Sequence, residues 1–176
     1  MASKITFSIG GIHPNDSKLA RERAIEVLPL PEVVYVSMAQ HLGAPAKPVV
    51  AVGDSVKTGQ VIAEPGGFIS AFVHSPVTGT VKSIGPRKDL AGNNVTHIAI
   101  VRTGEDEWAE GIDLSEDLVT AIPDDREAML ARIKACGVVG LGGATFPTHV
   151  KLNPGPAAKP ECLILNGAEC EPFLTS

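Results

Sequence analysis

The sequence predicts an α+β, multidomain protein in which a small all-β module precedes the opening of an α/β domain. Between residues 31 and 103, short runs rich in Val and Ile alternate with Gly, Pro and Asp turns, which is typical of a small all-β unit. From residue 124 onward an amphipathic segment, a glycine-rich loop, a second short segment and an apolar run follow one another. That order is typical of an α/β domain.

Six segments of the β module have the composition of strands. We expect strands at "VVYVSM" (33–38), "KPVVAV" (47–52), "QVIAE" (60–64), "FISAFV" (68–73), "GTVKSI" (79–84) and "VTHIAIV" (95–101). Before them, residues 1–30 hold "GGIHPND" and "LPLP" and predict an irregular arm. After them, the acidic residues 104–123 predict a linker, and residues 124–176 the incomplete start of the α/β domain.

A helix is expected directly after the linker. Asp124 is the predicted N-cap, and Glu127 three residues later gives the spacing of a capping box. Gly137 can end the helix in a left-handed conformation. The predicted apolar stripe of this helix consists of Met129, Ile133 and Cys136, with Leu130 beside it.

Composition excludes several classes of function. The chain of 176 residues has 15 basic and 20 acidic residues, and the basic ones are scattered, which argues against nucleic acid as a partner. No apolar run reaches the roughly 18 to 20 residues of a membrane span, and "MASKITFSIGGIHP" has no signal pattern. The cysteines Cys136, Cys162 and Cys170 lack a C-x-x-C spacing and predict reduced thiols. We therefore expect a soluble, intracellular chain without a metal site.

The loop "GLGGATFPTHVKL", residues 140–152, is the first candidate binding site. Gly140, Gly142 and Gly143 have no Cβ, so a ligand can approach their backbone N–H groups closely. Pro147 suits the first turn of a helix, whose free N–H groups attract an anion, and Lys151 adds a positive charge. The pattern predicts a phosphate cradle, although a tight turn that binds nothing explains the glycines about equally well.

Polar residues at the end of the apolar run "CLILN" form the second candidate. Asn166 ends this predicted strand, and Glu169 and Glu171 follow it. Ligands of open α/β sheets gather at the carboxyl ends of strands. Asn166 offers both a donor and an acceptor to a heteroaromatic edge, and the carboxylates can accept hydrogen bonds from ribose, ribityl or carboxamide groups. The alternative is a solvated acidic loop.

The stretches "VAVGDSVKTGQVIAE" and "HSPVTGTVKSI" resemble the barrel-sandwich domains of biotinyl and lipoyl carriers. The carrier lysine should stand at the hairpin tip after "GQVIAE", where this chain has "EPGGFIS", while Lys57 and Lys82 lie elsewhere. We therefore expect a scaffold or docking surface. For His41 and His74 a structural, hydrogen-bonded role is expected, and for His13 local turn chemistry.

The pair "GLGGATFPTHVKL" and "NGAECEPFLT" resembles the flavin and nicotinamide site of the C subunit of Rnf electron-transport complexes, which are membrane-bound, ion-pumping ferredoxin:NAD oxidoreductases. It is also similar to the flavin-binding NADH dehydrogenase subunit of respiratory complex I. The stretches "GGIHP", "IEVLPLP", "QHLGAPAKP" and "HSPVTGTV" match the Rnf pattern as well, so the resemblance covers almost the whole chain.

The resemblance implies roles for residues of the glycine loop. Gly140, Gly142 and Gly143 would lie against the phosphate and isoalloxazine of FMN. Lys151 would bind the phosphate, and Phe146 would stack on the adenine of NAD.

It also implies roles for the residues after the apolar run. Asn166 would contact the flavin ring, and Glu169 and Glu171 would lie on the nicotinamide side. Two positions depart from the complex I pattern, since Leu141 replaces an Arg and Ala168 replaces an Asp.

For the whole protein, the resemblance implies electron transfer between NAD(H) and ferredoxin through FMN and two 4Fe–4S clusters. The cluster motifs are absent from this sequence, so we expect an N-terminal fragment that is inactive alone and binds FMN weakly or not at all. The partners would be other subunits of the complex, with ferredoxin reached indirectly, at the cytoplasmic face of a membrane. Rival interpretations are a non-catalytic adaptor of a membrane complex, a carrier domain, and a related quinone-reductase subunit, which the two flavin motifs disfavour.

Overall fold

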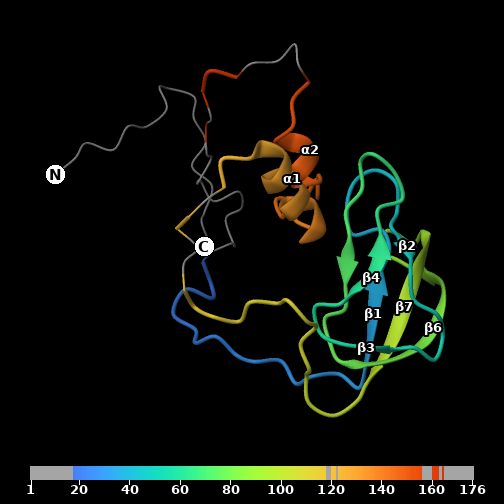
Figure 1. The fold of residues 1–176 in the computed structure, drawn as a ribbon. Helices are drawn as coiled ribbons and strands as arrows, with labels where there is room; N and C mark the ends of the chain where they lie inside the picture. The colour runs from blue at the N-terminus through green and yellow to red at the C-terminus, as the bar shows by residue number, and fades with distance from the viewer. Residues whose placement is uncertain (1–17, 118–119, 122, 156–159, 163, 165–176) are drawn as a thin grey trace, which may run out of the picture. The chain divides into compact units, whose positions relative to one another are not determined.

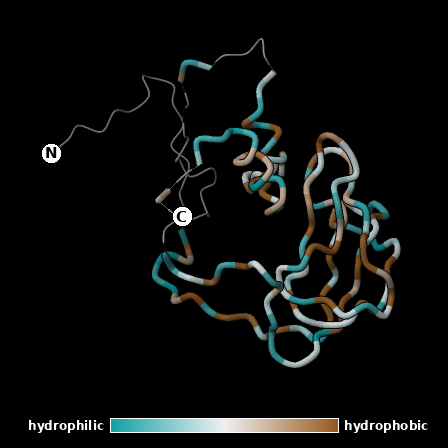
Figure 2. The backbone as a smooth tube through the Cα atoms, in the orientation of Figure 1, coloured by the Kyte–Doolittle hydropathy of each residue, from teal (hydrophilic) through white to brown (hydrophobic). Residues whose placement is uncertain are grey.

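The computed structural model describes residues 18–117, 120–121, 123–155, 160–162 and 164. The chain divides into two compact units, of which the first comprises Met1–Pro29 with Pro160–Ser176 and the second Leu30–Lys159. Among the described residues of the first unit there is no helix or strand. The described arm residues Ile25, Val27 and Leu28 are largely exposed. Figure 2 shows hydrophobic, brown stretches in the coloured part of the chain.

In its described residues the second unit contains two antiparallel sheets (Figure 1). The larger sheet has the strand order β1-β7-β6-β3, with bounds β1 Val33–Ser37, β7 Asn94–Arg102, β6 Gly79–Lys88 and β3 Ser55–Val56. The smaller sheet has the order β2-β4-β5, with bounds β2 Lys47–Pro48, β4 Val61–Glu64 and β5 Val73–His74.

The strand register separates the two faces of the larger sheet. Val36 of β1 lies opposite Ile98 of β7, and both side chains are buried. Tyr35, which precedes Val36 on β1, is exposed and carries the guanidinium of Arg87 over its ring at 3.7 Å. Alternation of this kind places one face of a strand in the core and the other toward solvent.

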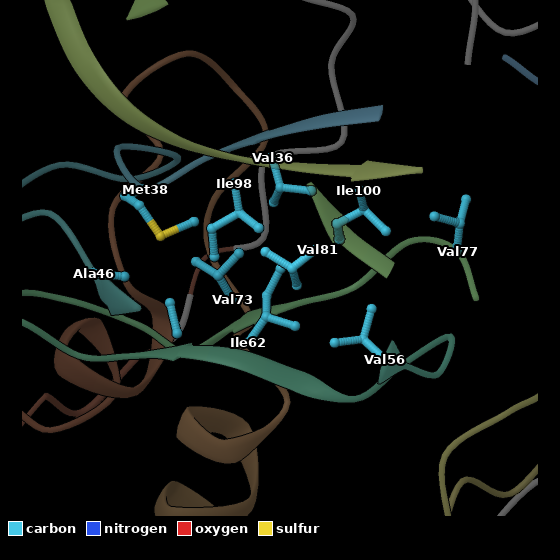
Figure 3. Close-up of a cluster of buried hydrophobic side chains, with 11 residues drawn as sticks. Val36, Met38, Ala46, Val56, Ile62, Val73, Val77, Val81, Ile98 and Ile100 are labelled. Carbon is cyan, nitrogen blue, oxygen red and sulfur yellow. The ribbon is translucent and has the colours of Figure 1, made fainter. Parts of the chain in front are cut away.

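The core lies between the two sheets. Figure 3 shows Ile98 and Ile100 of the larger sheet meeting Ile62 and Val73 of the smaller one. The full buried cluster contains Val36, Met38, Ala46, Val56, Ile62, Ala63, Val73, Val77, Val81, Ile98 and Ile100. Because each buried aliphatic side chain contributes roughly 1.5 to 3 kcal/mol, this cluster is the main source of stability for the barrel.

Four of the six predicted strands form near their predicted positions, as β1, β4, β6 and β7. The segment 47–52 is strand only at its first two residues, because the Asp54 carboxylate accepts the Ala51 N–H at 2.8 Å and turns the chain. The prediction for 68–73 is also wrong except at Val73. There the Gly66 N–H bonds to the Ser70 hydroxyl at 2.9 Å, which satisfies the backbone locally instead of in a ladder.

The first residues of the acidic stretch are attached to the barrel. The Asp106 carboxylate accepts hydrogen bonds from the Thr58 hydroxyl at 3.1 Å and the Thr78 N–H at 3.0 Å. The Thr78 N–H, followed by the Thr58 hydroxyl and the charge of Arg102, lowers the pKa of Asp106. Backbone bonds from Thr58 to Glu107 and from Ala109 to Thr58 continue this attachment.

The described residues after the barrel include two short helices, α1 Arg126–Ala135 and α2 Thr148–Lys151. The predicted N-cap Asp124 is wrong by one residue: Asp125 caps α1 and accepts the Ala128 N–H at 3.0 Å. The predicted capping box therefore does not form, because Glu127 lies one position too early relative to Asp125. Gly137 does follow α1 with φ of 66°, as predicted.

The predicted apolar stripe of α1 is only partly covered. Met129 and Ile133 are half-buried and Cys136 is exposed, so α1 buries no residue fully. None of the helices in the described part of the chain has the length and apolar character needed to cross a membrane.

Candidate functional site

The glycine loop is closed at its base by backbone pairing. The Gly140 N–H donates to the Phe146 carbonyl at 3.0 Å, and the Thr148 N–H donates to the Val138 carbonyl at 3.0 Å. Between them Val139 and Pro147 form an antiparallel bridge, and the Pro147 side chain is fully buried. Residues 141–145 therefore project from a fixed base.

Lys151 reaches back from α2 to this base. A Cβ built on Gly140 would lie 3.7 Å from the Lys151 Nζ and 3.7 Å from the Phe146 nitrogen. Among the residues that the structure describes, Lys151 has no ion-pair partner. The amine therefore lies over the bare backbone of Gly140 with its charge available to an anion.

The rest of the loop is open to solvent. Nothing lies within 4 Å of a Cβ built on Gly142 or Gly143, and Gly143 has φ of 111°, a conformation that side chains disfavour. Leu141 is 92% exposed at the loop tip, where the complex I pattern has an arginine. The structure thus brings together Gly140, Phe146 and Lys151 and leaves the Gly142–Gly143 backbone accessible.

His149, on α2 between the loop and Lys151, was missed by the sequence reasoning. Its Nδ1 is buried and has no hydrogen-bond partner within the described structure. Burial is the main cause that lowers the pKa of His149, and the charge of Lys134 lowers it further. The sequence signal that points to His149 is its position directly after the Phe-Pro-Thr run of the candidate binding loop.

His41 and His74, the two barrel histidines for which a structural role was expected, have structural contacts. His41 is 7% exposed, and its Nε2 accepts the Ala71 N–H at 3.1 Å. Burial lowers the pKa of His74, against a smaller upward effect of its hydrogen bond to the Ala135 backbone. His13 lies outside the described residues.

Asn166, Glu169 and Glu171, together with Ala168, lie outside the described residues. Within the described ranges, no three His, Cys, Asp or Glu side chains come together as a metal site would require.

Comparison with known proteins assigns the family. The profile described as "RnfC Barrel sandwich hybrid domain" matches residues 6–105, more than half of the chain. The chain belongs to the RnfC family. A second profile, the "Nuo51 FMN-binding domain", matches residues 133–176 and so includes the glycine loop. The predicted order, a barrel-sandwich domain followed by the start of a flavin-domain fold, is confirmed.

The curated relatives of this RnfC-family chain are named as C subunits of ion-translocating oxidoreductase complexes. It is 45% identical over 168 residues to the C subunit of the proton-translocating ferredoxin:NAD(+) oxidoreductase complex of Clostridium ljungdahlii, covering 95% of this chain and 36% of that protein. It is 44% identical over 173 residues to the Na(+)-translocating counterpart of Acetobacterium woodii, covering 95% and 37%. It is 41% identical over 174 residues to the C subunit of the ion-translocating oxidoreductase complex of Rhodobacter capsulatus, covering 97% and 33%. The chain thus spans about a third of the length of these relatives.

Proposed function

We propose that this chain forms the barrel and flavin-loop part of a protein that transfers electrons between NAD(H) and ferredoxin, as the C subunit of an ion-translocating complex. The single observation that supports it most is the position of the Lys151 amine over the half-buried Gly140 backbone, 3.7 Å from the Cβ position. The names of the relatives and the match to the FMN-binding profile support this reaction class.

The described residues fit the FMN phosphate. Its dianion needs a positive charge and free backbone donors in a place where no side chain intervenes. Lys151 provides the charge, and the open backbone at Gly142 and Gly143 provides the space. When bound, FMN supplies the exchange between two-electron and one-electron chemistry, while the protein supplies binding and orientation.

The remaining assignments extend this proposal. Phe146, half-buried beside Gly140, would stack on the adenine of NAD, and Asn166 would contact the flavin ring. Glu169 and Glu171 would lie on the nicotinamide side. Two 4Fe–4S clusters would be held by the part of the protein that these 176 residues do not include, and membrane association would come through partner subunits.

Quenching of FMN fluorescence tests the proposal. The natural full-length protein should quench at stoichiometric concentration, and the 176-residue chain should quench weakly or not at all. Lys151→Gln in the full-length protein should weaken FMN binding at least tenfold, since a hydrogen bond to a charged group contributes about 1.5 to 3 kcal/mol. Lys82→Gln, which removes the same charge from an exposed barrel position, should leave the affinity unchanged.

A non-catalytic adaptor is the second candidate, and the exposed apolar arm favours it. Ile25, Val27 and Leu28 offer an unburied hydrophobic segment for a partner protein to cover. If Lys151→Gln and Lys82→Gln both leave electron transfer between NADH and ferredoxin unchanged, the adaptor function replaces the flavin site.

A further inference from the structure

The barrel contacts the glycine-loop segment on both sides of the loop. Before the loop, a Cβ on Gly137 would lie 2.5 Å from the Phe72 carbonyl oxygen and 3.3 Å from the His74 ring. Near the end of the loop, the Leu42 N–H donates to the Thr145 carbonyl at 3.2 Å. Both contacts come from the second unit, so the loop is attached to the barrel at its two ends.

The barrel segment that reaches Thr145 is held in place by a buried histidine. His41 Nε2 accepts the Ala71 N–H at 3.1 Å and lies 3.4 Å from the Ser70 hydroxyl. Because Nε2 is an acceptor, the proton belongs on Nδ1, which then donates to the Leu42 carbonyl at 3.2 Å. The His41 ring therefore joins the 70–71 backbone to the peptide group that follows Leu42.

Close packing leaves this segment little freedom. The Ala44 N–H donates to the Ile69 carbonyl at 3.0 Å. Gly43 has φ of 99°, and any Cβ there would collide with the same Ile69 carbonyl. The position of the Leu42 N–H is thus set by contacts within the barrel and not by the loop that it binds.

The hydrogen bond from Leu42 holds Thr145, which has an unfavourable backbone conformation. Among the described residues it is the non-glycine residue with a positive φ, 46°, which a β-branched side chain disfavours. Such a conformation persists where the surroundings hold it. The next residue, Phe146, closes the loop base by accepting the Gly140 N–H.

We propose that His41 is a positioning residue for the flavin loop: through Leu42 it holds Thr145 at positive φ and thereby orients Phe146 and the Gly140 backbone. This inference rests on the proposed FMN site. Under this proposal the barrel contributes to cofactor binding indirectly: its 41–44 segment holds the glycine loop, and the glycine loop binds the cofactor.

A double-mutant cycle in the natural full-length protein tests the role of His41, with FMN fluorescence quenching as the readout. His41→Ala should weaken FMN binding about fivefold or more. Thr145→Gly removes the strain at this position, because glycine adopts positive φ freely, and its own FMN affinity is the reference for the second half of the cycle. In the Thr145→Gly background, His41→Ala should weaken binding less than twofold. A general loss of barrel stability would not produce this rescue.

Thr58→Val is the matched control. Thr58 is also 7% exposed in the barrel, but its hydroxyl bonds to Asp106 and Thr78 and not toward the glycine loop. This variant should keep wild-type FMN affinity. Leu42→Pro, which removes the N–H that Thr145 accepts, should reproduce the loss seen in His41→Ala and decides the matter if His41→Ala does not fold.

The outcomes separate the two proposals. If the wild type quenches FMN but His41→Ala or Leu42→Pro weakens binding no more than Thr58→Val, the positioning role is wrong and the FMN site stands. An equal loss from His41→Ala in the wild-type and Thr145→Gly backgrounds also overturns it. If the wild type does not quench FMN, the proposed function is wrong and the positioning role falls with it.

Discussion

The Lys151 Nζ lies 3.7 Å from the point where a Cβ on Gly140 would stand. At this distance an added methyl group makes ordinary van der Waals contact, so the protein tolerates it. The same methyl group nevertheless occupies the space between the amine and the bare backbone. Stability and ligand binding should therefore respond differently to a change at this position.

Gly140→Ala should change the free energy of unfolding by no more than about 0.5 kcal/mol while weakening FMN binding several-fold in the natural full-length protein. Denaturant titration and fluorescence quenching measure the two effects. Gly85→Ala is the control, because nothing lies within 4 Å of a Cβ at that position. Unchanged FMN affinity in Gly140→Ala would place the ligand elsewhere.

Gly143→Ala should loosen the loop itself. Gly143 has φ of 111°, where an alanine is strained by about 1 to 3 kcal/mol. Amide hydrogen exchange over residues 138–148 should speed up in this variant. Gly142→Ala meets no atom within 4 Å and should exchange like the wild type, so equal behaviour of the two variants would contradict the prediction.

Ile62→Ala should destabilise the barrel by about 2 to 5 kcal/mol, because the side chain is fully buried between the sheets and its loss leaves a cavity. The fluorescence of Trp108, the one tryptophan of the chain, reports unfolding, since its ring packs beside Gly59. Val52→Ala, at a position 62% exposed, should change stability by no more than about 0.5 kcal/mol. A small effect of Ile62→Ala would mean that the two sheets do not share one core.

Asp125→Ala should weaken helix α1 by about 1 kcal/mol, because it removes the acceptor of the Ala128 N–H. Faster amide exchange at the first turn of α1 is the measurement. Asp124→Ala serves as the comparison and should have little effect. If Asp124→Ala proves the more damaging of the two, the helix begins where the sequence pattern predicted.

The pH dependence of stability should have two separate windows. The pKa values of His74 and His149 are lowered from 6.5, so below pH 6.5 the unfolded chain binds more protons than the folded one and the unfolding free energy falls as pH decreases. The lowered pKa values of Asp89, Asp106 and Asp113 contribute stability above pH 3.8 that is lost as the pH falls below it. Denaturant titrations from about pH 3 to about pH 8 should show both steps. His74→Gln with His149→Gln should remove the upper step, and persistence of that step would assign it to another group.

Local patterns in the sequence were sufficient for most of the barrel. Alternating aliphatic residues predicted β1, β4, β6 and β7, since a strand buried on one face needs that pattern whatever its partner is. The segments 49–52 and 68–72 have strand-like composition but lie outside the strands, with a turn at Val52 and bends at Phe68 and Ile69. The Asp54 carboxylate and the Ser70 hydroxyl accept backbone N–H groups in these segments and turn the chain there, and strand propensity does not include such bonds.

In the glycine loop, too, the sequence predicts some features and tertiary contacts decide others. Its three glycines, Pro147 and Lys151 indicate a place where a ligand can approach the backbone, because the absence of a Cβ and the presence of a charge are properties of the residue types. That the Lys151 amine returns to Gly140, and that Thr145 is held by the Leu42 N–H, follows from contacts between segments about 10 and 100 residues apart. Contacts at that separation depend on how the barrel packs around Ile62 and Ile98, and no local pattern specifies them.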